Sequence, residues 1–233
     1  MDRKLLSLLR AWKGRSGRKP LVLNGVRQVG KTYLLQKFGE RDFPKCHYFN
    51  FEEDGDLGLF FNRNLKPNRI LSELQFQSKE PINPLTDLLI FDEIQECPRA
   101  LTSLKYFQEE MPELAICCAG SLLGIHLNTG SFPVGKVEII DMYPMTFFEF
   151  LAALGEKESL EFLQQWRPDK EIPLSLHHRL WDRLKWYFIV GGLPEVVQTF
   201  LDHQDNHLIA FQEARNKQEQ LVIGYIAIVR KQW

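Results

Sequence analysis

The sequence has 233 residues, of which 44% are hydrophobic and 25% are charged, and its formal net charge is -1. A chain of this length and apolar content can bury a sizeable core, and one domain with a smaller appended one is the expected organisation. The nearly neutral charge excludes a strong overall field that would attract nucleic acid or an anionic membrane.

The first twenty residues depart from this balance. Basic residues here outnumber the single acid Asp2: Arg3, Lys4, Arg10, Lys13, Arg15, Arg18 and Lys19. The apolar spacing over residues 3–12 predicts a short amphipathic helix, which a basic linker follows. Two interpretations of the basic segment 1–17 stay open: an arm that attracts phosphate groups, and a solvated helix face.

Neither a signal peptide nor a membrane-spanning helix is predicted. The leucines of residues 5–9 are interrupted by polar side chains, and no apolar run approaches membrane-spanning length. The four cysteines form no C-x-x-C pair: Cys46, Cys97, Cys117 and Cys118. Such a pattern is typical of reduced thiols in the cytoplasm, so we expect a cytoplasmic protein without a membrane partner.

Predicted strands and helices alternate over residues 20–141. Short apolar runs predict buried strands at 21–23, 47–51, 88–91, 115–119 and 137–140. The segments between them predict helices at 31–38, 69–75 and 98–110. This alternation indicates βαβ units, and hence an α/β fold with a parallel sheet flanked by helices.

After Pro144 the pattern becomes helical. Helices are predicted at 147–154, 159–166, 177–189, 194–201 and 210–233. We therefore place a domain boundary near Tyr143–Met145. The predicted domains are the basic N-terminal helix 1–17, the α/β core 18–145 and a small, partial helical domain 146–233.

A phosphate-binding motif stands between the first predicted strand and its helix. Its residues match G-x-x-x-x-G-K-[ST]: Gly25, Val26, Arg27, Gln28, Val29, Gly30, Lys31 and Thr32. In such a P-loop the backbone N–H groups and the following helix dipole attract phosphate. Lys31 is expected to reach the β- and γ-phosphates of a nucleotide, Thr32 to bind Mg²⁺, and Tyr33 to lie beside the nucleotide.

For Arg27 two roles stay open. Its side chain either touches the γ-phosphate or a neighbouring subunit, or is solvated.

Two acids end the apolar run 88–91, in the arrangement called Walker B. We expect a strand neighbouring that of the P-loop to deliver Asp92 beside Thr32, where its carboxylate holds the Mg²⁺ shell. Glu93 is expected to orient and polarise the attacking water as the general base. The alternative is a helix N-terminus decorated with acids.

Ser121 follows the predicted strand 115–119. A polar side chain in this place can hydrogen-bond the γ-phosphate or the water, which is the sensor 1 role. Ser121 is equally compatible with the N-cap of the segment 122–124.

These segments together resemble the prokaryotic AAA-domain ATPases, whose signature is G-x-R-Q-V-G-K-T. The similarity runs in order through residues 18–32, F-D-E-I-Q at 91–95, G-S at 120–121, the segment 143–150 and G-G-L-P-E at 191–195. The resemblance implies a P-loop NTPase core, a helical lid, and ATP with Mg²⁺ as ligands. In the related archaeal-type and STAND proteins a Gly-x-Pro turn touches the adenine, and Pro194 is the matching residue. A proline opening a helix explains Pro194 as well.

Two departures from the family pattern stand out. Many members have Gly-Arg where this chain has Gly135-Lys136, and lysine lacks the guanidinium fork of a charge-stabilising finger. Members usually continue into a further C-terminal domain. The sequence given ends at Trp233, which we interpret as a truncated or frame-disrupted copy.

The sequence therefore predicts Mg²⁺-dependent hydrolysis of ATP, with Lys31, Glu93 and Ser121 as the catalytic residues. Two alternatives stay open: an ATP/ADP switch or interaction module with little turnover, and a DNA-associated ATPase that uses the basic arm. A protein partner or an oligomer is compatible with the sequence. No motif specifically indicates nucleic acid.

Overall fold

The computed structural model describes residues 3–121, 133 and 135–231, with side chains described as far as residue 227. The chain divides into two compact units. The core unit is Leu5–Tyr143, and the helical unit is Pro144–Trp233 together with Met1–Lys4. In the described part of the chain, no helix combines the length and the apolar character needed to cross a membrane.

The core unit contains one sheet of five strands within the described residues. Its strands are β1 (Leu21–Asn24), β2 (Cys46–Asn50), β3 (Leu88–Asp92), β4 (Ala115–Gly120) and β5 (Glu138–Asp141). They are ordered β2-β3-β4-β1-β5, and every neighbouring pair is parallel. This parallel pairing confirms the predicted α/β sheet. Parallel strands need long crossover connections, which helices usually form.

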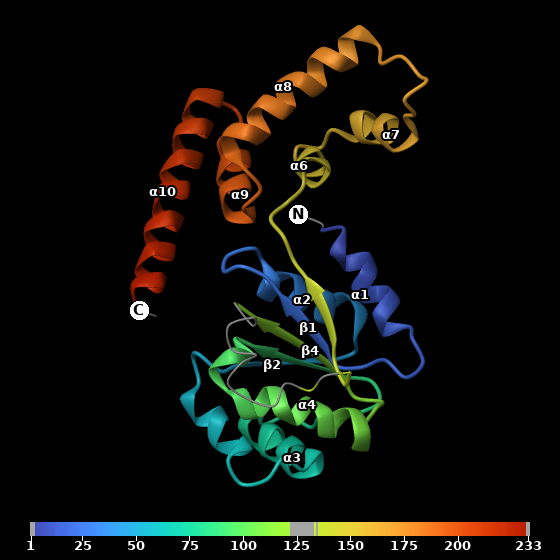
Figure 1. The fold of residues 1–233 in the computed structure, drawn as a ribbon, viewed down its shortest axis with the longest axis vertical. Helices are drawn as coiled ribbons and strands as arrows, with labels where there is room; N and C mark the ends of the chain where they lie inside the picture. Colours follow the sequence, from blue (N-terminus) through green and yellow to red (C-terminus); the bar gives the residue numbers. More distant parts are fainter. Residues whose placement is uncertain (1–2, 122–132, 134, 232–233) are drawn as a thin grey trace. The chain divides into compact units, whose positions relative to one another are not determined.

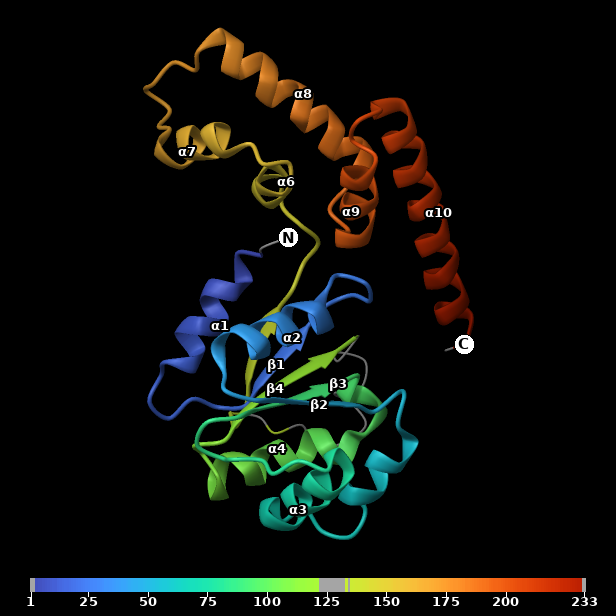
Figure 2. The ribbon, with the colours of Figure 1, turned by 180° about the vertical axis from the view of Figure 1, so that it is seen from behind.

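Helices cover both faces of this sheet (Figures 1 and 2). The helices of the core unit are α1 (Leu5–Lys13), α2 (Lys31–Asp42), α3 (Pro67–Ser78) and α4 (Pro98–Glu110), with the short 3-10 helices η1 (Gly55–Phe61) and η2 (Ile94–Glu96). Alternate strand residues face opposite layers. Leu88 and Ile90 of β3 pack with α1 and α2, whereas Leu89 and Phe91 pack with α3 and α4.

The N-terminal helix is part of the core unit. Leu6, Leu9 and Trp12 of α1 are buried in the same cluster as α2 and the sheet. Residues 1–17 were expected to form a separate segment, but the apolar stripe of α1 places that helix in the core layer because its leucines and tryptophan need cover.

Much of the basic N-terminal charge is paired within the chain. The cations hydrogen-bond acidic side chains or backbone carbonyls: Arg3 with Glu149 at 3.0 Å, Arg10 with Asp42 at 2.9 Å, Arg15 with Glu138 at 2.9 Å, Lys13 with the Asp42 carbonyl, and Arg18 with the Glu113 carbonyl at 2.6 Å. Such pairing reduces the charge available to a phosphate backbone. The side chains of Arg10 and Arg15 are 51% and 53% exposed, as a solvated helix face predicts.

The helical unit has its own core. It consists of α6 (Phe147–Ala153), α7 (Lys157–Gln165), α8 (Leu174–Val190), α9 (Pro194–Asp202) and α10 (His207–Lys231). Thr146 and Glu149 form a capping box at the start of α6, which satisfies free backbone N–H groups there. Phe150, Val197 and Phe200 are buried between these helices.

Two segments of the family resemblance meet inside the helical unit. The N–H of Met145 donates to the carbonyl of Gly192 at 2.6 Å, and the Tyr187 hydroxyl donates to the Met145 carbonyl at 2.8 Å. A Cβ on Gly192 would lie 2.3 Å from that carbonyl oxygen. Glycine is therefore required at 192, because any side chain would separate the two segments.

Candidate functional site

The residues Gly25–Thr32 connect β1 to α2 with an unusual backbone. Gln28 and Gly30 have positive φ angles of 62° and 92°. At Gly25 a Cβ would lie 2.4 Å from the carbonyl oxygen of Met142. These conformations curl the loop at the start of α2, where backbone N–H groups have no partner within the helix. Such a loop suits an anion.

The side chains of the loop differ in exposure. Val29 is completely buried in the core cluster shared with α1 and α2, so only its backbone can face a ligand. Val26 and the Tyr33 ring are exposed, at 44% and 56%. The loop therefore offers a ligand its backbone groups and its two outward side chains.

We expect Gly25→Ala to destabilise the core unit by about 1–3 kcal/mol, since the new methyl must push the loop away from Met142. Urea unfolding followed by circular dichroism measures this cost. Gly58→Ala is the matched control, because a Cβ there meets no atom within 4 Å. Equal stability of the two variants would contradict the packing argument.

The ammonium group of Lys31 lies inside the loop. Its side chain belongs to a residue only 5% exposed, and Nζ donates to the carbonyls of Gly25 and Val26 at 2.9 and 3.0 Å. Nζ also donates to the hydroxyl of Ser121 at 3.0 Å. Burial lowers the pKa of this ammonium from its usual value, while the nearby carboxylates of Glu93 and Asp92 act in the opposite direction.

Thr32 and Asp92 come together at the start of α2. The Thr32 hydroxyl donates to Oδ2 of Asp92 at 2.7 Å, across sixty positions of sequence. The Tyr48 hydroxyl of β2 donates to the same oxygen at 2.8 Å. Burial, followed by the hydrogen bond to Asp92, raises the pKa of Tyr48, so its hydroxyl stays a donor.

Glu93 follows Asp92 in a left-handed backbone conformation, with φ 48° and ψ 44°. Its N–H donates to Oδ1 of Asp92 at 3.0 Å, and its carboxylate accepts a hydrogen bond from the Gln95 side chain. The N–H of Ser121 donates to the same Gln95 side chain at 3.2 Å. Residues 122–124, which Ser121 was alternatively expected to cap, lie outside the described residues.

These groups meet because the carboxyl ends of parallel strands share one edge of the sheet. The P-loop follows β1, Asp92 ends β3, and Ser121 follows β4. Ligands of open α/β sheets bind at this edge. The expectation that β3 neighbours β1 is wrong: β4 lies between them, and the Asp92 carboxylate still reaches Thr32.

Tyr48 and Gln95 belong to the candidate site in the structure but were not predicted from the sequence. Tyr48 occurs within a strand run that reads as core packing, and only the pairing of β2 with β3 sets its side chain beside Asp92. Gln95 appears in the F-D-E-I-Q string, where only its partner Glu93 is near in sequence. Its second partner, Ser121, comes within reach only through the fold.

Two further cations, Arg27 and Lys136, could have contacted a phosphate, but each forms an ion pair with an acid of the core unit. Arg27 forms an ion pair with Glu52 at 3.4 Å. Lys136 pairs with Glu109 at 2.9 Å and precedes β5, which starts level with the beginning of β1. Lys136 therefore lies at the amino ends of the strands, whereas the P-loop lies at their carboxyl ends.

Pro194 occupies the first turn of α9 in the helical unit. This is the position that the alternative interpretation assigned to it, as a proline that opens a helix. The contact to adenine stays a prediction.

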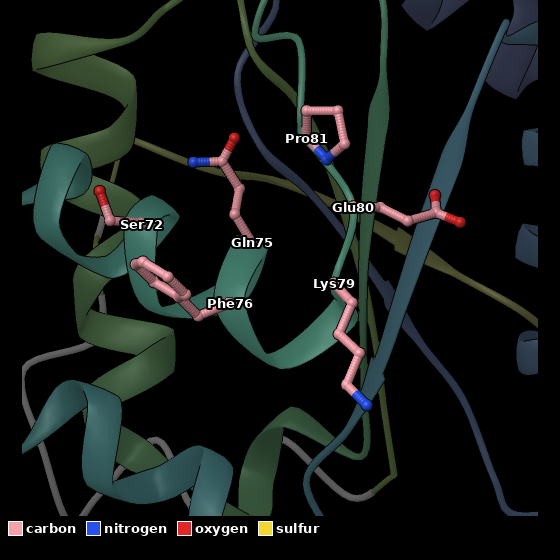
Figure 3. A pocket seen from close by; sticks show the side chains of 6 residues that line it. All are labelled: Ser72, Gln75, Phe76, Lys79, Glu80 and Pro81. Carbon is pink, nitrogen blue, oxygen red and sulfur yellow. The ribbon is translucent and has the colours of Figure 1, made fainter.

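A separate pocket of about 490 Å³ lies beside the C-terminal end of α3 (Figure 3). Six residues line it: Ser72, Gln75, Phe76, Lys79, Glu80 and Pro81. The side-chain oxygen of Gln75 already accepts the N–H of Ile82 at 2.9 Å. None of the predicted site residues lines this pocket.

The parallel sheet, with the loop Gly25–Thr32 after β1 and an acidic residue at the end of β3, has the fold of the P-loop NTPases. The family model described as AAA domain matches residues 17–151, more than half of the chain. The chain belongs to the AAA domain family.

Solved structures are similar to this chain to different degrees. A Walker-type ATPase of Pyrococcus abyssi, paby2304, has a TM-score of 0.59 at 19% identity, covering 99% of this chain and 76% of that one. A RuvB variant of Thermotoga maritima has a TM-score of 0.47 at 17% identity, with 91% and 67% covered. PCH-2 of C. elegans has a TM-score of 0.48 at 11% identity, with 92% and 66% covered. No curated protein matches the sequence.

Proposed function

We propose that this protein binds ATP with Mg²⁺ at the P-loop and hydrolyses it to ADP and phosphate. The observation that carries the proposal is the 2.7 Å contact between the Thr32 hydroxyl and the Asp92 carboxylate. It joins the two halves of a nucleotide site, which come from segments far apart in the sequence.

The phosphate tail would be bound by the loop and by Lys31. Loop amides and the N-terminal end of α2 attract the negative oxygens. The Lys31 ammonium already lies within the loop, held by the carbonyls of Gly25 and Val26. The β- and γ-phosphates would replace partners of this ammonium with charged acceptors, which form stronger hydrogen bonds.

Thr32 and Asp92 fit the protein share of a Mg²⁺ site. Both offer oxygen atoms, which Mg²⁺ prefers, and the ion commonly takes its other ligands from phosphates and water. Among the described residues no group of three or more His, Cys, Asp or Glu side chains converges, so this part of the chain offers no all-protein cage. When bound, Mg²⁺ neutralises charge on the phosphate oxygens.

Tyr48 would keep Asp92 in place for this task. Its hydroxyl and that of Thr32 both donate to one carboxylate oxygen. Two such donors hold the carboxylate in one orientation at the start of α2.

The reaction would be the attack of water on the γ-phosphorus. The Glu93 carboxylate takes a proton from the water as the new P–O bond forms, and the bond to the ADP oxygen breaks. Ser121, beside Lys31 in the structure, would hydrogen-bond the γ-phosphate. In the same proposal Pro194 contacts the adenine, and the protein works in the cytoplasm.

Nucleotide titration coupled to phosphate release tests this proposal. We expect saturable ATP binding with Mg²⁺, phosphate release that requires the metal, and loss of release when EDTA removes it. The expected cause is the loss of phosphate charge neutralisation. An EDTA-treated sample restored with MgCl₂ is the control. ATP binding absent at millimolar concentration, or release insensitive to EDTA, would contradict the proposal.

A further inference from the structure

The Gln95 side chain occupies a buried position between two parts of the candidate site. Gln95 is the middle residue of η2 and is 7% exposed. Its Nε2 donates to Oε2 of Glu93, and its Oε1 accepts the N–H of Ser121 at 3.2 Å. One amide thus joins the segment after β3 to the residue after β4.

The orientation of this amide follows from its partners. A carboxylate only accepts hydrogen bonds and a backbone N–H only donates. The NH₂ group must therefore face Glu93, and the oxygen must face Ser121. Both ends of the side chain are used, so turning the amide over would break both bonds at once.

The orientation of the Glu93 side chain depends on this contact more than that of Asp92 does. Its backbone is in the left-handed region, which a non-glycine residue adopts only where surrounding contacts hold it. In the described part of the chain no side chain other than Gln95 donates to its carboxylate. Asp92, in contrast, accepts hydrogen bonds from Thr32, Tyr48 and a backbone N–H.

The other end of the amide reaches the phosphate-binding side of the site. Ser121 is 4% exposed, and its hydroxyl accepts a hydrogen bond from Lys31. Gln95 therefore fixes the backbone of the residue proposed to contact the γ-phosphate. Through that residue it also reaches the lysine of the P-loop.

We propose that Gln95 is a positioning residue for hydrolysis. Its amide sets the separation between the Glu93 carboxylate and Ser121, so the base and the γ-phosphate contact stay aligned across two strands. This inference rests on the proposed hydrolysis. A misplaced base lowers the rate of the chemical step rather than the affinity for nucleotide.

Two substitutions separate the bonds of Gln95. Gln95→Met keeps the length of the side chain and removes both bonds. Gln95→Glu keeps an oxygen for the Ser121 N–H, but its carboxylate cannot donate to Glu93. We expect both variants to lower kcat by roughly 10- to 100-fold and to leave KM and the ATP Kd within about threefold of wild type.

Gln75→Met is the matched control, because the Gln75 side chain also accepts a backbone N–H but lies on α3, outside the site. We expect it to keep wild-type kcat. Thermal melting of all variants compares their stability. If Gln95→Met melts early, Gln95→Glu still decides, since full activity there would show that the bond to Glu93 is unnecessary.

A double variant tests the route through Glu93. In a Glu93→Gln background, we expect Gln95→Met to lower the residual rate by a much smaller factor than in the wild-type background, because the base is already gone and only the support of Ser121 is lost. If Gln95→Met lowered the rate of the Glu93→Gln variant by the same factor as it lowers the wild-type kcat, the inference would be overturned. Wild-type kcat in Gln95→Glu would also overturn it. Wild-type hydrolysis by Glu93→Gln alone would instead overturn the proposed function.

Discussion

Replacing Lys31 by alanine is expected to remove most nucleotide binding and turnover. The substitution deletes a buried ammonium that would meet two phosphates, and each hydrogen bond to a charged group contributes about 1.5–3 kcal/mol. Losing two of them predicts at least a ~100-fold weaker Kd for MgATP, since about 1.4 kcal/mol is tenfold. Isothermal titration calorimetry and a phosphate-release assay measure the two effects.

The control for this variant is another lysine of the core unit. Lys45→Ala removes a half-exposed ammonium whose partner is Glu80 at 3.6 Å, outside the site. We expect it to bind ATP normally. Lys31→Met keeps the aliphatic stem, so its loss of binding would come from the charge. Wild-type affinity and rate in both Lys31 variants would refute the site assignment.

Replacing Glu93 by glutamine is expected to stop hydrolysis while ATP still binds. The amide is isosteric with the carboxylate but cannot take the proton of the attacking water. A positioned general base commonly contributes about 10²- to 10⁴-fold, so we expect kcat to fall by that factor. The Kd for MgATP should stay close to wild type, because Lys31, Thr32 and Asp92 are unchanged.

This variant separates an enzyme from a nucleotide switch. Glu110→Gln, at the exposed end of α4, is the control for the loss of one carboxylate and should release phosphate at the wild-type rate. Unchanged hydrolysis by Glu93→Gln would show that the carboxylate plays no part in turnover. The interpretation as an ATP/ADP switch would then remain.

The strand pattern was predictable because a buried strand leaves a local signal. The apolar run before Asp92 has both faces covered in the structure, as continuous apolar residues indicate. Helix limits were less accurate. The predicted helix 69–75 extends over Pro67–Ser78, because Pro67 suits its first turn and the left-handed Lys79 ends it.

The contacts of the N-terminal cations were not predictable in the same way. Arg10 pairs with Asp42 and Arg15 with Glu138, and no spacing rule relates these positions. The sequence therefore left open whether the basic charge was available to a ligand. The packing of α1 against the sheet decided which acids came within reach.

By itself the sequence determined the P-loop, the acid pair after an apolar strand and the parallel α/β class, because each depends on neighbouring residues and short-range periodicity. Only the tertiary structure decided that β4 lies between β1 and β3, that Tyr48 and Thr32 share one oxygen of Asp92, and that Gln95 joins Glu93 to Ser121. These contacts join residues from different strands and loops. Strand order and register set their distances, and both follow from how the whole chain buries its apolar surface.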